Sequence, residues 1–284
     1  MASSSAYLLV SHGSRDPRPQ IQVEQLARLL VPRLQRFDMT SSPAVVALGR
    51  GDCLTDQAIA PQSTAHVHPV PARVAPLTPP PLLGTAVLEC HPLPLSEQIL
   101  QFAQQALARG CCQIGIVPLF LLPGVHVLED IPAEVAIART QLNFSLDCKI
   151  YPYVGSHPNL ADLLRRPDGS PLGEPSTAWI LVSHGSRRPG GNAPVEAIAR
   201  TINAHPAYWS IAPSLEDRIL ELEAQGYRDI TVVPYFLFPG GITDAIAQSL
   251  GAIAQRYPHL SLHSTAPLGT TEALADLVAD LIID

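Results

Sequence analysis

The chain has little of several features that define other classes of protein. Lys149 is the only lysine among 18 basic residues, and charged residues make up 15% of the 284 residues. The formal net charge is −7 at pH 7, which argues against nucleic acid as the main partner, because phosphate backbones are bound by surplus basic side chains. The apolar fraction of 46% is nevertheless that of a globular protein and not of a disordered one.

Paired cysteines and long apolar runs are missing as well, and we expect no leader segment. The cysteines form no Cys-x-x-Cys pair and no zinc pattern; they are Cys53, Cys90, Cys111, Cys112 and Cys148. Without a disulfide framework we expect a reducing compartment. No apolar run reaches the ~18 residues of a membrane span, and the opening MASSSAYLLV lacks the basic residues of a signal peptide. We therefore expect a cytoplasmic protein with no membrane contact.

Two motifs each occur twice, in the same order. YLLVSHGSR at 7–15 returns as WILVSHGSR at 179–187, an offset of 172 residues. VPLFLLPG at 117–124 returns as VPYFLFPG at 233–240, an offset of 116 residues. The chain is therefore a tandem duplication, and its first half is longer between the two motifs by about 56 residues.

Proline-rich segments divide the duplicated chain. Residues 40–86 contain PVPARVAPLTPPPLLG, which at this proline density predicts an inserted, extended loop. A second run of helix and strand breakers at 166–177 predicts a linker. The expected units are thus an N-terminal lobe at 1–165, which carries the insertion, and a C-terminal lobe at 178–284.

Short apolar runs alternate with longer segments of helical periodicity. In the first half we expect strands at 6–11, 86–89, 112–120 and 148–154, with helices at 17–36, 95–109 and 131–141. In the second half we expect strands at 179–183, 229–236 and 260–263, with helices at 194–204, 214–225, 242–256 and 271–282. This alternation predicts an α/β fold of two tandem-duplicated lobes, each a parallel sheet covered by helices on both faces.

Three polar residues of the first half stand where predicted parallel strands end. His12 follows the first strand, Glu89 ends the second, and His126 lies in the loop after the third. Ligands of open parallel sheets bind beyond the carboxyl ends of the strands, so we expect these side chains to share one rim. Two imidazoles and a carboxylate can ligate a borderline divalent metal, and imidazole also accepts protons near neutral pH.

The second half keeps only one of these three positions. His184 takes the place of His12, whereas Ile242 stands where the second histidine is expected. The glutamate position falls at Trp209 or Ser210, depending on a gap of one residue. We therefore expect the first half to carry the chemistry and the second half to complete the wall of a cleft.

The same motifs resemble the sirohydrochlorin chelatase family of class II tetrapyrrole chelatases. The resemblance rests on LLVSHGSR at 8–15, on the LEC around Glu89, and above all on VPLFLLPGVHVLEDIP at 117–132. PYFLFPG at 234–240 resembles the degenerate second repeat of that family. The resemblance covers the chain except the insertion at 40–86, and implies a chelatase-like fold of two lobes with the macrocycle held in the cleft between them.

By this resemblance the chain would insert Co²⁺ or Fe²⁺ into sirohydrochlorin, on a route to siroheme or cobalamin. His12 and His126 would be metal ligands and proton acceptors, and Glu89 would accept protons or guide the metal. The metal would be a substrate, with no permanently bound cofactor. The long insertion departs from the minimal family pattern, and its His66 and His68 only weakly echo the metal-binding segments of longer members.

A carboxylate-rich macrocycle would need a locally basic cleft in this acidic protein. The main-chain N–H groups of Gly13 and Ser14 at the strand-to-helix turn could bind a carboxylate, and so could Arg15 or His184. Further arginines follow the two SHGSR motifs: Arg18, Arg187 and Arg188. An ordinary solvated helix start explains these arginines equally well.

Two other functions remain open at this point. A metal or tetrapyrrole carrier would use the same ligands without turnover. A histidine phosphatase would need an arginine before the loop histidine, where this chain has Ser11 and Ser183. The oligomeric state and the physiological metal do not follow from the sequence.

Overall fold

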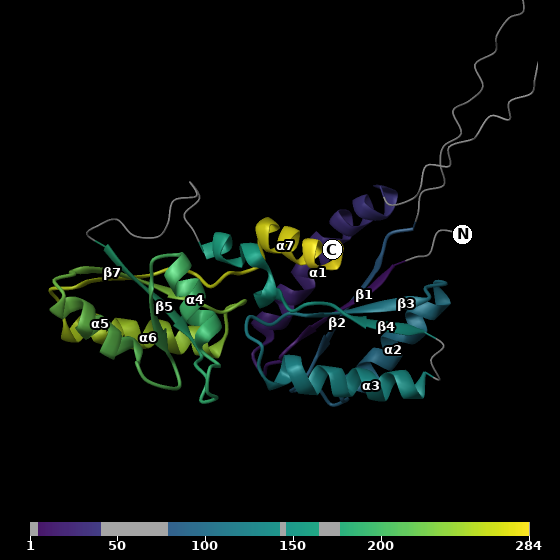
Figure 1. The fold of residues 1–284 in the computed structure, drawn as a ribbon, viewed down its shortest axis with the longest axis horizontal. Helices are drawn as coiled ribbons and strands as arrows, with labels where there is room; N and C mark the ends of the chain where they lie inside the picture. Colours follow the sequence, from purple (N-terminus) through teal and green to yellow (C-terminus); the bar gives the residue numbers. More distant parts are fainter. Residues whose placement is uncertain (1–4, 41–78, 143–145, 165–176, 284) are drawn as a thin grey trace, which may run out of the picture.

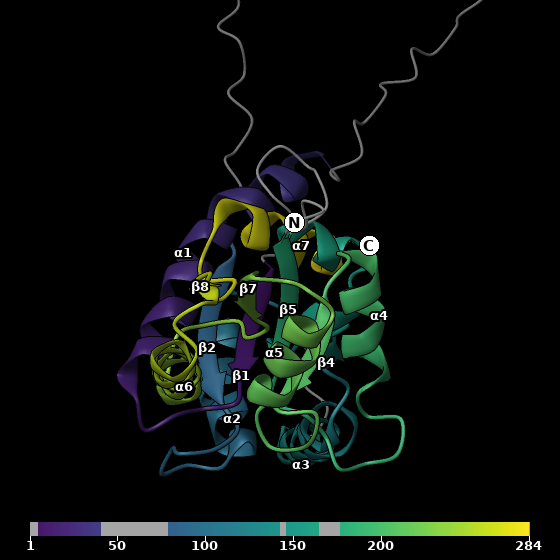
Figure 2. The ribbon, with the colours of Figure 1, turned by 90° about the vertical axis from the view of Figure 1, so that its left-hand side faces the viewer.

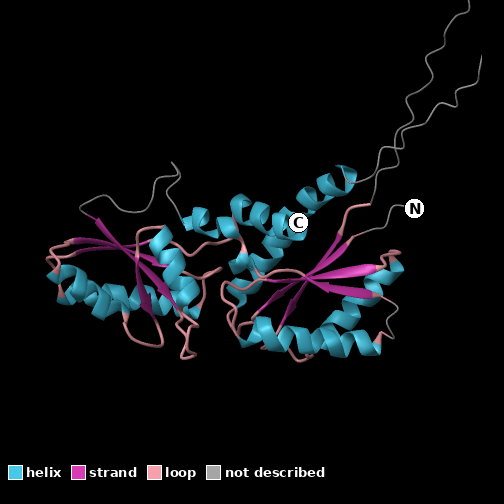
Figure 3. Cartoon of the chain, in the orientation of Figure 1, coloured by secondary structure: helices cyan, strands magenta, loops and turns pink. Residues whose placement is uncertain are grey.

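The computed structural model describes residues 5–40, 79–142, 146–164 and 177–283. They form two lobes, each a four-stranded parallel sheet flanked by helices (Figure 1). The strand orders are β2-β1-β3-β4 and β6-β5-β7-β8. Figure 3 shows strands and helices alternating along both lobes. The duplicated α/β fold predicted from the two repeated motifs is thus confirmed.

The first lobe follows the strand–helix alternation predicted for it. Its strands are β1 (Ala6–Ser11), β2 (Leu82–Val87), β3 (Gln113–Pro118) and β4 (Asp147–Ile150). Its helical segments are α1 (Pro17–Thr40), α2 (Leu95–Ala108), the π-helical turn η1 (His126–Asp130), α3 (Ile131–Gln141), and the 3₁₀ segments η2 (Val154–Ser156) and η3 (Pro158–Leu164). The side chains of β1 alternate between its two faces, and both faces are covered by helices. Leu8 and Val10 pack with α2 and α3, and Leu9 packs with α1.

The second lobe repeats this order with one strand that the sequence did not predict. Its strands are β5 (Thr177–Ser183), β6 (His205–Tyr208), β7 (Asp229–Pro234) and β8 (Ser261–Ser264), and its helices are α4 (Ala193–Thr201), α5 (Leu215–Ala224), α6 (Gly241–Arg256) and α7 (Glu272–Ile283). The unpredicted strand is β6. It is four residues long and contains Pro206, which an edge strand tolerates because one side of it has no ladder to complete.

The second strand begins earlier than predicted, which shortens the insertion. Strand β2 starts at Leu82, directly after the last proline, and pairs with β1 from Leu82 to Val87. Gly84 looks like a breaker in the sequence, yet it lies inside the strand. Glycine is needed there because a Cβ would come within 2.7 Å of the Phe102 ring. The interpretation of 40–86 as an insertion is therefore wrong for residues 82–86. Residues 41–78, with His66 and His68, lie outside the described part of the chain, as does the predicted linker up to residue 176.

One apolar core joins the two lobes. It contains fully buried side chains from helix α1, such as Leu26 and Leu30, and from α7, such as Leu274 and Val278. The same core includes one face of each sheet together with residues of η3 and α4. Helix α7 ends the second half in sequence, yet it packs beside α1 of the first half (Figures 1 and 2). The duplicated sequence divides near residue 178, but the packed core does not.

Polar contacts tie the same helices together. Arg33 of α1 forms ion pairs with Glu272 and Asp276 of α7. The Thr270 hydroxyl donates to the Gln22 carbonyl at 2.9 Å. Within the described residues, no helix is both long and apolar enough to cross a membrane. With the lobes held in this way, the carboxyl ends of both sheets open onto one shared space.

Candidate metal centre and substrate cavity

The register of the first sheet brings three loops to one rim. Ser11 pairs with Val87, and Val10 pairs with Pro118, so β1, β2 and β3 end at the same level. Glu89 lies two residues beyond β2 rather than at its end, and its N–H donates to the His12 carbonyl at 2.8 Å. The hydrogen-bond ladder thus continues past the strands and sets the two loops side by side.

Gly13 allows these loops to approach each other. Its φ is +93°, a left-handed conformation that favours glycine. A Cβ at this position would lie 2.0 Å from the Glu89 carbonyl oxygen, so any side chain would push the two loops apart. The sequence predicted that the Gly13 N–H binds substrate, and the structure adds this packing requirement at the same residue.

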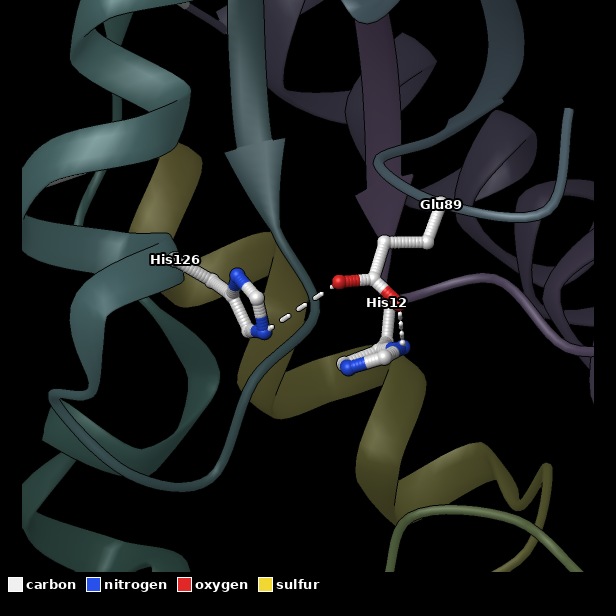
Figure 4. A group of neighbouring side chains, drawn as sticks. All are labelled: His12, Glu89 and His126. Atoms are coloured by element: carbon white, nitrogen blue, oxygen red, sulfur yellow. Dashed lines mark ion pairs between the residues drawn. The ribbon is translucent and has the colours of Figure 1, made fainter.

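The three predicted residues meet at the rim. Glu89 lies between the two histidines: one carboxylate oxygen is 4.0 Å from His12 Nδ1 and the other is 4.0 Å from His126 Nε2 (Figure 4). The imidazole rings are 4.8 Å apart, centroid to centroid, and nearly perpendicular at 88°. One ligand atom from each residue lies within 4.8 Å of the others. The group can therefore close around one divalent ion with small side-chain movements, and it is exposed enough to exchange that ion.

A fourth residue orients His126. The Asp130 carboxylate is 2.7 Å from His126 Nδ1, one turn further along η1. A neutral imidazole that donates from Nδ1 keeps its Nε2 lone pair for a metal, and carboxylates often fix metal-binding histidines in this way. The sequence reasoning missed this role of Asp130, although the spacing of four residues in a helical segment was the available signal.

A large cavity lies over this group and is lined by both lobes. Its volume is about 990 Å³, which is in the range of small-molecule sites. The first lobe contributes His12, Glu89 and His126, and the second lobe contributes Phe238 and Ile242. The candidate metal ligands of the first lobe and apolar side chains of the second lobe therefore line one cavity between the lobes.

The second lobe repeats the backbone of the site without its ligands. The Ser210 N–H donates to the His184 carbonyl at 2.9 Å, as the Glu89 N–H does to His12. Ser210, and not Trp209, is therefore the counterpart of Glu89. Ile242 at the start of α6 is 37% exposed. In the part of the chain that the structure describes, only the first-lobe group offers three such ligands to one ion.

The remaining predicted residues are spread around the cavity. Ser14 lines it, and the Ser14 hydroxyl accepts the Asp16 N–H at 3.0 Å. Arg15 is exposed and does not line it. Arg18 bridges the lobes, with Nη1 donating to Asp244 at 3.1 Å and further bonds to Asp16. Hydrogen bonds from Arg18 hold the pKa of both carboxyl groups below its usual value, so this bridge stays charged at neutral pH.

A family model and three curated relatives match parts of this chain. The CbiX family model matches residues 84–167 and 178–284, which include Glu89 and His126 but not His12. A chloroplastic sirohydrochlorin ferrochelatase of Arabidopsis thaliana is 35% identical over 36% of this chain and 50% of that protein. A sirohydrochlorin ferrochelatase and a sirohydrochlorin cobaltochelatase of Priestia megaterium are 24% and 25% identical, over 55% and 56% of this chain. The matches span 50%, 62% and 55% of these three relatives.

The fold also matches solved structures over nearly the whole chain. SirB from Bacillus subtilis with Fe³⁺ has a TM-score of 0.66 and 18% identity, covering 98% of this chain and 94% of that one. The sirohydrochlorin chelatase SirB from Bacillus subtilis subspecies spizizenii, in complex with cobalt, has a TM-score of 0.62 at 18% identity with the same coverage. At such identities the likeness shows the fold alone, and the two-lobed chelatase-like fold is confirmed.

Proposed function

Because the chain belongs to the CbiX family, we propose that it is a chelatase that inserts a divalent metal ion into sirohydrochlorin. The observation that carries the proposal is the convergence of His12, Glu89 and His126 on one wall of a cavity large enough for a macrocycle. The three curated relatives are named for this reaction with iron or cobalt. The metal is a substrate of the reaction, and so is the macrocycle.

The reaction needs metal ligation and proton acceptance, and this group of residues can supply both. The incoming metal ion must exchange water for protein ligands, and His12, His126 and Glu89 offer two imidazole nitrogens and a carboxylate for that purpose. Two pyrrole N–H protons must then leave as the macrocycle nitrogens take the metal. Each side chain that releases the metal regains a lone pair, so the same groups can accept those protons.

The two walls of the cavity are suited to the two substrates, the metal ion and the macrocycle. The His12 and Glu89 side chains on the first-lobe wall are about half exposed, at 53% and 52%, which permits delivery of the metal from solvent. The opposite wall offers Ile242 and Phe238, on which the flat apolar face of a macrocycle can rest. A macrocycle held in this way would present its central nitrogens to His12 and His126. Gly13, Ser14 and His184 line the cavity and stay proposed contacts for the peripheral carboxylates, whereas Arg15 does not line it.

The proposal includes both Co²⁺ and Fe²⁺ as the metal substrate. Co²⁺ would indicate a route to cobalamin, and Fe²⁺ a route to siroheme. The two Priestia megaterium relatives differ in metal but are almost equally similar to this chain, at 24% and 25% identity. A site of two imidazoles and a carboxylate accepts several first-row ions, in the general order of divalent affinity. The cytoplasmic location expected from the sequence also stays a prediction.

A metallation assay tests the proposal against a non-catalytic carrier. Sirohydrochlorin in large excess over protein would be mixed with Co²⁺, Fe²⁺ or Ni²⁺, and the absorbance change compared with a protein-free reaction. Many turnovers per protein molecule are expected with at least one metal. A single stoichiometric turnover would identify a carrier, and no acceleration with any metal would overturn the proposal.

A further inference from the structure

A smaller pocket opens beside the main cavity, on the second lobe. Its volume is about 390 Å³, and it is lined by residues 184–188 and Ser210, with Gly124 and Val125 reaching across from the first lobe. Gly124, His184 and Arg188 also line the main cavity, so the two spaces are adjacent. Since Val125 directly precedes His126, the small pocket adjoins the first-lobe wall.

The small pocket has the charge of an anion site. Its counterpart in the first lobe contains the carboxylate of Glu89, whereas Ser210 here is neutral and donates its hydroxyl to the His184 carbonyl at 2.8 Å. Two arginines, Arg187 and Arg188, line the pocket. The Arg187 guanidinium forms no hydrogen bond or ion pair with the described residues. Arg188 has only one, a distant contact at 3.6 Å to Glu129 of the first lobe.

A buried hydroxyl at the base of the same loop points to the same kind of ligand. Ser183, which directly precedes His184, is 1% exposed and lines the main cavity. Its Oγ has no hydrogen-bond partner among the described residues. Buried hydroxyls are normally satisfied, so this one is available to a hydrogen-bond acceptor on a ligand in the main cavity, next to His184, which lines both spaces.

We propose that this pocket binds one peripheral carboxylate of the tetrapyrrole, through Arg187, Arg188 and His184. The inference rests on the proposed function and names a part of its substrate. Arginine is suited to the role because its planar guanidinium can pair with both oxygens of a carboxylate. The degenerate lobe would thus have exchanged a cation site for an anion site on the same backbone.

Glu129 and the two arginines should affect substrate affinity in opposite directions. Its carboxylate is 3.6 Å from Arg188, and both side chains are more than half exposed. An incoming substrate carboxylate would therefore compete with Glu129 for Arg188 at little cost, because exposed ion pairs are weak. Removing the Glu129 charge should favour the substrate, whereas removing the arginines should disfavour it.

The test is the affinity of metal-free sirohydrochlorin, followed by quenching of tryptophan fluorescence; Trp209 is exposed beside Ser210. The variant R187A/R188A should raise Kd by about tenfold or more, as expected for the loss of charge-assisted bonds. Its kcat at saturating macrocycle and its Co²⁺ affinity should stay unchanged. Arg200→Ala is the matched control, since Arg200 is an exposed arginine of the same lobe that lines neither space. Glu129→Gln should lower Kd.

Sirohydrochlorin methyl ester, with its carboxylates masked, completes the experiment. Wild type and R187A/R188A should bind the ester equally well, because the lost interaction needs the carboxylate. Equal affinities of the two proteins for the free acid, or the same loss for acid and ester, would overturn the inference. A wild-type protein that binds sirohydrochlorin but never metallates it would instead contradict the proposed function.

Discussion

The two lobes share a backbone and differ in the side chains at the rim. Each has a parallel four-stranded sheet and an SHGSR loop, and in each a main-chain N–H bonds the carbonyl of the loop histidine, Glu89 to His12 and Ser210 to His184. Only the first lobe brings three metal ligands together among the described residues. The fold therefore supplies equivalent positions in both lobes, and a few substitutions decide whether these positions carry potential metal ligands.

The two rims also differ in the residue that follows the histidine position by four places. His126 and its partner Asp130 are four residues apart in η1, whereas the residue four places after Ile242 is Ile246. Ile246 is fully buried at 0% exposure, as Ile131 is in the first lobe, so the second lobe has no carboxylate at this spacing. The second lobe therefore lacks both the histidine and an acid placed to orient it.

The largest effect should come from the first-lobe histidines. His12→Ala and His126→Ala should each lower kcat/KM for metallation about a hundredfold or more, since each removes a metal ligand and a proton acceptor. The matched control is His259→Ala, because His259 is an exposed histidine away from both cavities. Near-normal rates in either cavity variant, with the fold retained, would remove these residues from the site.

The next effect should come from the acid behind His126. Asp130→Asn should weaken Co²⁺ binding by about 10- to 100-fold, as is common when the partner of a metal-binding histidine is lost. Nitrogen chemical shifts of His126 should show loss of the Nδ1–H tautomer. Asp280→Asn, on the exposed side of α7, is the charge-matched control. An unchanged tautomer with weakened binding would show that Asp130 does not act through the ring.

The comparison predicts a gain of function as well. S210E/I242H should restore a second metal site beside His184, so that Co²⁺ titration by calorimetry reports two equivalents and not one. The new site should be weaker than the first by about 10- to 100-fold, because Ile246 offers no carboxylate to orient the new histidine. Ile242→His alone should give no second equivalent. One equivalent in the folded double variant would mean that the two rims differ in geometry and not only in side chains.

His184 gives a smaller and more discriminating test. His184→Ala should cost at most about tenfold in kcat/KM, roughly 1.4 kcal/mol, because His184 has no metal-binding partners on its rim and can only help to hold a substrate carboxylate. The loss should appear in KM and not in kcat. A loss as large as that of His12→Ala, measured with the same metal, would show that the site spans both lobes.

The sequence predicted what depends on local pattern and missed what depends on distant packing. The rim residues were found because parallel strands end at one edge, whatever covers the sheet. The start of β2 was missed because the reason for Gly84 is the Phe102 ring, which comes from another element. The pairing of α7 with α1 was also missed, since apolar periodicity shows which face is buried but not against what.

The smallest effect should come from the chain between α1 and β2, which differs most in length between the lobes. The second lobe makes the equivalent connection with three residues, from the end of α4 at Thr201 to the start of β6 at His205. Nothing in the shared fold therefore requires a long connection. Replacing residues 42–78, which lie outside the described residues, by a Gly/Ser linker of about ten residues should leave the melting temperature and the metallation rate unchanged. Extending the same deletion through Val87 should lower the melting temperature, because it removes Leu82 and the pairing of β2 with β1. If both deletions unfold the protein, residues 42–78 include packed structure. If neither does, β2 is not required for the stability of the sheet.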